Sequence, residues 1–224
     1  MTMSPIAKTV CLLSLTLLAC CCTGCQLPFV LAEMAFPNEK IKSEYTLPKD
    51  KSVLVFPDDM TNPVSYPPIK RELAEKINEY FRQNKLTGEV IPYQRLADLQ
   101  ADDANFNRMS VGTVGRKLGA DYVIYINIER FDLKESPTDT IWHANLEGRV
   151  RVVDSHTGQR TWPDESAGFP FKCGMPTTDN ASPGFGGVLT KALCNKAGTE
   201  ICYLFDSHEE RRSRPKEKET ELDH

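Results

Sequence analysis

The chain has 224 residues, a formal net charge of −4 and a pI near 5.7, with 40% hydrophobic and 26% charged residues. This size and composition suit one medium-sized domain with additional terminal segments. The acidic balance provides no electrostatic basis for a nucleic-acid partner, which normally requires a basic face.

The first residues predict an export signal. Lys8 is the only charged residue before the apolar run at residues 10–22, which is long enough for the hydrophobic segment of a signal peptide and short for a membrane span. This run leads into the sequence CCCTGC at residues 20–25. The segment resembles the bacterial lipoprotein signal, in which a small residue precedes the cysteine that is acylated and becomes the mature N-terminus.

Two cysteines compete for this role. Leu17-Leu-Ala-Cys20 has the favoured leucine three residues before the cysteine, whereas Cys22-Thr-Gly-Cys25 has the better small residues. We predict lipidation at Cys25, because this choice gives the longer apolar segment and leaves no extra thiols on the mature chain; Cys20 is the alternative. An ordinary cleaved signal peptide or a membrane-anchored N-terminus is the remaining interpretation. The lipoprotein resemblance implies several acyl chains, and two or more chains hold a protein stably on a bilayer.

We therefore predict a signal peptide at residues 1–24, a tether at 25–50, a single α/β domain at 51–207 and a disordered tail at 208–224. Prolines interrupt the tether, which shows no sustained hydrophobic period. The tail is dominated by interleaved charges.

The domain begins with a strand and a helix. Residues 51–56 are continuously apolar before Pro57, as in an interior strand. The following helix has proline in its first turn and then an apolar residue at every fourth position from Ile69 to Phe81, which predicts one core-facing side. A short strand at 89–91 and a short helix at 93–99 follow.

The centre of the predicted sheet lies between residues 109 and 132. Ser110 is placed to cap a helix that ends at Gly119, and residues 121–128 are dense in β-branched and aromatic side chains, as in a strand buried on both faces. The helix contains Val111-Gly-Thr-Val-Gly115, which resembles the G-x-x-G loop of RNA-binding KH domains. The residues between the glycines are not basic, so we interpret the glycines as allowing the helix to approach the sheet.

Two hairpins and a helix complete the domain. Residues 134–139 form the first turn, and the returning strand at 140–153 alternates apolar and charged residues. A turn at 154–158 leads to an edge strand at 159–162, ended by Pro163. We predict a Pro- and Gly-rich loop at 165–187 and an amphipathic helix at 188–207.

Candidate ligand-binding residues are few. Asp58 and Asp59 follow the carboxyl end of an interior strand, where open α/β sheets place ligands, although a solvated loop is the simpler interpretation. The four histidines lack the spacing of a metal site. The sequence therefore predicts no catalytic residue, no metal site and no cofactor.

Three cysteines remain in an oxidising compartment once Cys25 carries lipid. Cys194 and Cys202 are eight residues apart on one predicted helix, about 12 Å by helical rise, which exceeds the roughly 7 Å limit for a bridge. A disulfide therefore requires Cys173 with Cys194 or Cys202. The alternative is three buried thiols.

The order of elements resembles a domain of exported bacterial lipoproteins. This domain occurs in the curli secretion lipoprotein, the penicillin-binding-protein activator lipoproteins and the amino-terminal domain of the Tol-system propeller protein. The resemblance spans residues 51–205 and is carried by Ser52-Val-Leu-Val-Phe56, Leu118-Gly-Ala-Asp-Tyr-Val-Ile124 and Val152-Val-Asp-Ser-His-Thr-Gly158. It implies an α/β (α+β) fold with a mixed sheet of about five strands in the order β-α-β-α-α-β-β-β-α, helices packed on the sheet, and no enzymatic activity.

Our first hypothesis is a non-enzymatic lipoprotein of the cell envelope. It is tethered to the lipid bilayer through its acylated cysteine and faces the periplasm, on the outer membrane in preference to the inner one. It binds another envelope protein or assembles with itself. The alternative is a periplasmic binder of a small molecule or polysaccharide that uses Asp58 and Asp59, and a hydrolase with an unrecognised site is a remote third.

Overall fold

In the computed structural model, the chain is described at residues 39–59, 63–64, 66, 68–133, 141–178 and 184–210. Two compact units contain these residues. The larger unit, Lys42–Ser207, is called the body below, and the smaller unit contains the segments on either side of it. The predicted signal peptide, both candidate lipidated cysteines and the predicted hairpin turn at 134–139 lie outside the described residues.

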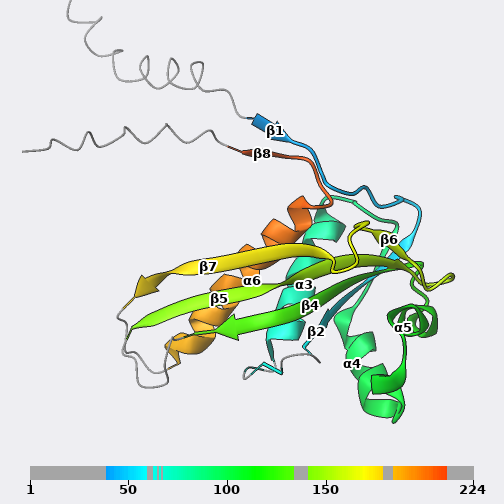
Figure 1. Cartoon of the computed structure of the whole chain (residues 1–224), viewed down its shortest axis with the longest axis horizontal. Helices are drawn as coiled ribbons and strands as arrows, with labels where there is room; N and C mark the ends of the chain where they lie inside the picture. The colour runs from blue at the N-terminus through cyan, green and yellow to red at the C-terminus, as the bar shows by residue number, and fades with distance from the viewer. Residues whose placement is uncertain are drawn as a thin grey trace, which may run out of the picture. The chain divides into compact units, whose positions relative to one another are not determined.

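The body contains a six-stranded mixed sheet (Figure 1). Its strand order is β3-β2-β4-β5-β6, and β7 also pairs with β5. Strand β2 runs parallel to β3 and β4, whereas the pairs that involve β5 are antiparallel. The strands are β2 (Ser52–Asp58), β3 (Glu89–Ile91), β4 (Tyr122–Asp132), β5 (Trp142–Asp154), β6 (Arg160–Trp162) and β7 (Phe169–Thr178).

Helices pack on both faces of this sheet, which confirms the predicted α/β (α+β) fold class. Their bounds are α3 (Pro68–Gln83), α4 (Tyr93–Asp102), η1 (Phe106–Arg108), α5 (Val111–Leu118) and α6 (Phe185–Tyr203). Helices α3 and α6 bury their apolar sides in the larger core, against alternate residues of β2, β4, β5 and β7. Helices α4, η1 and α5 contribute to a smaller core on the opposite face, against β2 and β4.

Local sequence signals explain why these elements form where they do. Ile69, Leu73, Ile77 and Phe81 of α3 are fully buried, as their four-residue spacing predicted. The hydroxyl of Ser110 accepts a hydrogen bond from the N–H of Thr113, and the left-handed residue after α5 is the predicted glycine.

Strand β7 corrects the sequence prediction of a loop at residues 165–187. It pairs with β5 from Phe169 opposite Val150 to Thr178 opposite Trp142. Two prolines and a glycine lowered its apparent strand propensity, but β7 lies at an edge of the sheet, where proline is tolerated because one side of the backbone needs no partner.

The body also begins earlier than the predicted boundary at residue 51. Leu47 is buried in the larger core, and the Tyr45 ring packs on Trp162 and Phe205, with ring centroids 5.9 and 6.5 Å away. The N–H of Tyr45 donates to the carbonyl oxygen of Leu204 at 2.9 Å. Residues 42–50 are therefore part of the packed body and not of a tether.

The smaller unit is a two-stranded antiparallel ribbon. Strand β1 (Glu39–Ile41) pairs with β8 (His208–Glu210), in the register Glu39 with Glu210 and Ile41 with His208. Each segment corrects a prediction, because β1 falls in the predicted tether and β8 in the predicted disordered tail. Neither three-residue strand carries a local signal, and the pairing joins residues distant in the chain. The rest of the predicted tail lies outside the described residues.

Candidate functional site

The two predicted ligand residues, Asp58 and Asp59, have partners inside the body. Asp58 is the last residue of β2, and its buried carboxylate accepts a hydrogen bond of 2.6 Å from the hydroxyl of Tyr125 on β4. Burial and this carboxylate both raise the pKa of Tyr125, so the hydroxyl keeps its proton. The pair is therefore a buried link between adjacent parallel strands.

Asp59 is held by a neighbouring helix. Its carboxylate accepts hydrogen bonds from the ammonium group of Lys70 at 2.7 Å and from the N–H of Val64 at 3.0 Å. Burial acts to raise the pKa of Asp59, but these two donors outweigh it and hold the pKa below its ordinary value. Asp59 thus links the residues after β2 to the first turn of α3.

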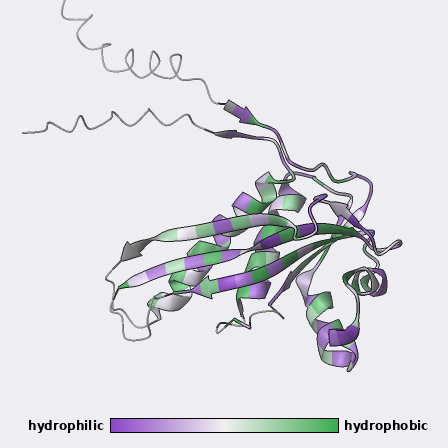
Figure 2. Ribbon diagram, viewed as in Figure 1, coloured by the Kyte–Doolittle hydropathy of each residue, from purple (hydrophilic) through white to green (hydrophobic). Residues whose placement is uncertain are grey.

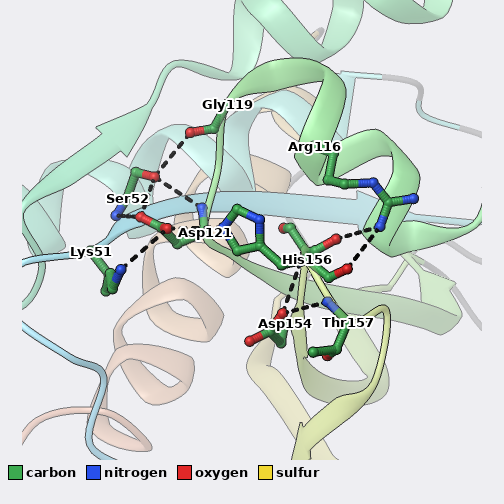
Figure 3. Close-up of polar contacts among 9 residues, drawn as sticks. Lys51, Ser52, Arg116, Gly119, Asp121, Asp154, His156 and Thr157 are labelled. Atoms are coloured by element: carbon green, nitrogen blue, oxygen red, sulfur yellow. Dashed lines mark hydrogen bonds and ion pairs between the residues drawn. The ribbon is translucent and has the colours of Figure 1, made fainter.

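A second polar cluster lies at the opposite end of the parallel strands (Figure 3). Asp121, just before β4, accepts hydrogen bonds from both the N–H and the hydroxyl of Ser52, each at 2.9 Å. Its other oxygen lies 3.2 Å from Nε2 of His156 and 3.5 Å from the ammonium nitrogen of Lys51. The hydrogen bond from the N–H of Ser52 lowers the pKa of Asp121 most. Together these contacts hold that pKa far below its ordinary value.

The turn that carries His156 is fixed from two sides (Figure 3). The Asp154 carboxylate accepts hydrogen bonds of 2.8 Å from the N–H groups of His156 and Thr157. The guanidinium of Arg116 on α5 donates to the carbonyl oxygen of Ser155 at 2.6 Å. The sequence identified this stretch as part of a fold signature, but not Asp121 as its centre. The cluster joins the starts of β2 and β4 to the turn at 154–158, and the Ser52 hydroxyl in it donates to the Asp121 carboxylate.

Helix α5 meets the same turn through its glycines. A β-carbon at Gly115 would lie 2.2 Å from Oγ of Ser155 and 2.6 Å from a methyl carbon of Val123, and one at Gly112 would lie 2.9 Å from Cα of Gly158. These distances confirm that the glycines of the G-x-x-G segment allow close packing of the helix.

On the face of the sheet opposite α3 and α6, strands β4, β5 and β7 carry a charged surface. Leu146 and Val150 of β5 are buried in the larger core, so the alternate residues 147, 149 and 151 point to the other face. Figure 2 shows hydrophilic and hydrophobic residues alternating along β5. Cross-strand ion pairs join Glu147 to Lys172 at 2.8 Å and Arg149 to Glu129 at 3.0 Å. We call these four residues the charged face.

Helices leave the charged face open in the described part of the chain. Helices α4 and α5 pack over β2 and the first residues of β4 (Figure 1). Tyr125 belongs to the same core, and the Arg151 guanidinium lies 4.9 Å from the centroid of its ring. Beyond that point the Lys172 side chain is 73% exposed and the Glu129 side chain is 43% exposed. The sequence predicted a wet side for β5, but not the strand β7 that extends it.

Of the two alternatives for the cysteines, a disulfide from Cys173 to Cys194 or Cys202 is not formed in the structure. Cys173, Cys194 and Cys202 are free thiols, and all three are buried in the larger core. Burial raises the pKa of Cys173 and of Cys194 to about 12, and it also raises the pKa of Cys202. The side chains fill core positions between the sheet and α6, where a thiol packs as a small apolar group.

Other candidate sites are weak. A pocket of about 170 Å³ lies between α3 and α6, lined by Glu72, Glu75, Lys76, Glu79, Lys191, Cys194 and Asn195. This volume is below the roughly 300 Å³ at which ligand pockets usually begin. Within the described ranges, no group of three or more His, Cys, Asp or Glu side chains could hold a metal ion. The helices of that same part of the chain are each too short or too polar to cross a membrane.

No family model matches the sequence, and no curated protein matches it. Solved structures with a similar arrangement include bacterial lipoproteins. Lipoprotein GNA1162 from Neisseria meningitidis is 15% identical with a TM-score of 0.42, covering 66% of this chain and 99% of its own. A PelC dodecamer from Paraburkholderia phytofirmans is 12% identical with a TM-score of 0.42, covering 75% and 98%. The LpoB C-terminal domain from Salmonella enterica is 14% identical with a TM-score of 0.32, covering 60% and 84%. Likenesses this distant assign neither a family nor a function.

Proposed function

We propose that this protein is a non-enzymatic lipoprotein of the bacterial cell envelope whose body binds another protein through the charged face. The lipid anchor is supported by the apolar run and the CCCTGC sequence at residues 20–25. The binding role is supported by one structural observation: the ion pairs on β4, β5 and β7 lie on a part of the sheet that no described helix covers.

Each ion pair of the charged face joins an exposed side chain to a half-buried one, an arrangement better suited to recognition than to stability. A solvent-exposed pair contributes about 0–1 kcal/mol to folding, because water screens the attraction and two long side chains lose freedom. The same charges steer a partner with complementary charges and reject one whose charges repel. The charged face presents acidic and basic groups on neighbouring strands, so it fits a protein surface with the reverse arrangement of charge.

The alternative function, a binder of a small molecule or polysaccharide at Asp58 and Asp59, is not favoured by the geometry. The Asp58 carboxylate is buried against the Tyr125 hydroxyl, and Asp59 binds Lys70 and a backbone N–H. A ligand at either carboxylate would compete with these internal partners.

The test exchanges the two charges of one ion pair. The double variant Glu147→Lys with Lys172→Glu keeps an attractive pair between the same strands but reverses the charges that a partner meets. The matched control is Arg71→Glu with Glu75→Arg, because that exposed pair lies on α3, outside the charged face.

Both double variants are produced in cells as membrane-attached proteins, cross-linked in place and recovered under gentle detergent. The proposal predicts that the parent chain and the α3 control recover the same defined envelope protein, whereas the β5–β7 exchange loses it without a change in thermal stability. Equal recovery by all three chains would contradict a role of the charged face in binding.

A further inference from the structure

Arg151 on β5 differs from the other basic residues of the open sheet surface, because it has no carboxylate partner. The other Lys and Arg side chains of β4, β5 and β7 each form an ion pair, in the pairs Arg130–Asp132, Arg149–Glu129 and Lys172–Glu147. Within the residues that the structure describes, the Arg151 guanidinium forms neither an ion pair nor a hydrogen bond. Its positive charge is therefore left for a group from outside the body.

Two neighbours hold the Arg151 side chain in place. The guanidinium carbon lies 4.9 Å from the centroid of the Tyr125 ring, within the range of a cation–π contact. The aliphatic stem lies against the segment before β7, where a β-carbon at Gly168 would be 2.9 Å from Cγ of Arg151. The guanidinium thus has a defined position before a partner arrives, which reduces the entropy lost on binding.

Burial removes water from part of this guanidinium without supplying an acceptor. Nε of Arg151 is buried and has no hydrogen-bond partner, while the side chain as a whole is half-buried. The donors that a partner can reach are therefore those of the two terminal nitrogens. A charge in partly dehydrated surroundings attracts an opposite charge more strongly than one in open water, so this position favours an anion.

The carboxylate on the far side of the tyrosine contact is already engaged. The Tyr125 hydroxyl donates to the buried Asp58 carboxylate at 2.6 Å, and Asp58 forms no ion pair with Arg151. The neighbouring arginine on the same face of β5 is also engaged, since Nε of Arg149 donates to Glu129 at 3.0 Å. Arg151 is the basic side chain of this surface that an added carboxylate can pair without breaking an existing ion pair.

We propose that Arg151 binds a carboxylate of the partner protein, from an aspartate or glutamate side chain. This inference rests on the proposed binding role of the charged face. Alternate residues of a strand are about 7 Å apart, so a protein that covers Arg149 also reaches Arg151. The two oxygens of a carboxylate match the planar fork of guanidinium donors, and arginines in desolvated positions are frequent among the residues that contribute most to binding.

The first measurement uses a small carboxylate in place of the partner. The full acylated chain, isotope-labelled at its arginine side chains, is held in neutral detergent micelles and titrated with sodium acetate or with sodium chloride. The Nε–H signal of Arg151 is followed by NMR and is assigned by its loss in Arg151→Lys. The control is the signal of Arg71, an exposed arginine on α3.

We expect the Arg151 signal to shift saturably with acetate, by at least about three times the shift of Arg71, and not to respond to chloride. The absence of a saturable shift at Arg151 would overturn the inference while leaving the charged face as a binding surface. A response to inorganic phosphate at about one tenth of the acetate concentration would also overturn it, by assigning the site to phosphate groups.

The second measurement connects this site to the partner. Arg151→Gln, Arg151→Lys and the control Arg71→Gln are cross-linked in cells and recovered as described for the exchange of Glu147 and Lys172. We expect Arg151→Gln to lower recovery of the envelope protein by about tenfold or more, with the thermal stability of the body retained. Arg151→Lys should restore only part of the recovery, because an ammonium group lacks the fork of donors.

The outcomes separate this inference from the proposed function. Full recovery by Arg151→Gln, with loss in the exchange of Glu147 and Lys172, would overturn the carboxylate site alone. Full recovery by Arg151→Lys would show that charge is sufficient and would overturn recognition by the guanidinium fork. A parent chain that recovers no envelope protein would refute the proposed function, and this inference with it.

Discussion

The hydroxyl of Tyr125 donates a hydrogen bond of 2.6 Å to the carboxylate of Asp58, across two adjacent parallel strands. Both side chains are buried. The position that the sequence offered as the best ligand site is thus occupied by a partner from the body itself. This contact links β2 to β4.

Removal of the Tyr125 hydroxyl should destabilise the body. We expect Tyr125→Phe to lower the free energy of unfolding by about 1–3 kcal/mol, because a buried carboxylate loses a donor. The measurement is urea unfolding at neutral pH. Tyr45→Phe is the matched control, since the hydrogen bond of 3.3 Å from the Tyr45 hydroxyl to Thr161 is exposed. Equal effects of the two substitutions would contradict the assigned importance of the buried link.

Asp121 should contribute stability that depends on pH. Its pKa in the folded chain lies below the usual 3.8, so its contribution is complete above that value and declines as the pH falls toward the folded pKa. We expect Asp121→Asn to cost at least about 1 kcal/mol at pH 7, with a difference from the parent chain that shrinks between about pH 5 and pH 3. Unfolding curves recorded across this pH range measure the difference in free energy of unfolding between the variant and the parent chain.

Asp103→Asn is the comparison for that experiment. Asp103, the residue after α4, also has a lowered pKa, chiefly through its hydrogen bond with Lys117 on α5 and less through one from the N–H of Asn105, but it lacks the additional donors that surround Asp121. Its effect should therefore be smaller than that of Asp121→Asn. A cost for Asp121→Asn that stayed constant from pH 7 to pH 3 would show that its charge is not the source of the stability.

Two glycine substitutions should have opposite effects. Gly115→Ala places a methyl group within 2.2 Å of Oγ of Ser155, so we expect a loss of about 1–3 kcal/mol from overpacking. Gly187→Ala lies in α6 with no atom within 4 Å of the new methyl group, so a gain of about 0.5–1 kcal/mol is expected. Thermal unfolding of both variants distinguishes them. A neutral result for Gly115→Ala would mean that α5 does not pack this closely on the sheet.

The three core thiols should be inert until the body unfolds. Burial raises the pKa of Cys173 and Cys194 to about 12, so the reactive thiolate is scarce and shielded near neutral pH. We expect iodoacetamide to add no label to the native body and three labels, at Cys173, Cys194 and Cys202, after unfolding without reductant. Fewer labels after unfolding would indicate a disulfide in the isolated protein.

The sequence predicted most elements that have a strong local period. The four-residue spacing in α3, the cap at Ser110 and the glycine at residue 119 were sufficient to place two helices. The dense β-branched residues of β4 and the alternation in β5 located the central hairpin. In each case the spacing or capping residue that predicts the element lies within or next to the element itself.

The errors occurred where distant parts of the chain determine the structure. In strand β7, Phe171 and Cys173 contact the larger core and Phe169 stacks on Trp162, a period-two signal that its prolines obscured. The pairing of β1 with β8, and the packing of Tyr45 on Trp162, depend on residues more than a hundred positions away. The role of Asp121 likewise appears only when Ser52 and the turn at 154–158 lie beside it.

The proposed function requires that the chain is exported and acylated near its start. The direct test is the intact mass of the membrane-bound protein, together with the mass of its N-terminal tryptic peptide. We predict a mature chain that begins at Cys25 and carries several acyl groups. A chain that still begins with Met1 and carries no lipid, recovered from the cell interior, would contradict the account.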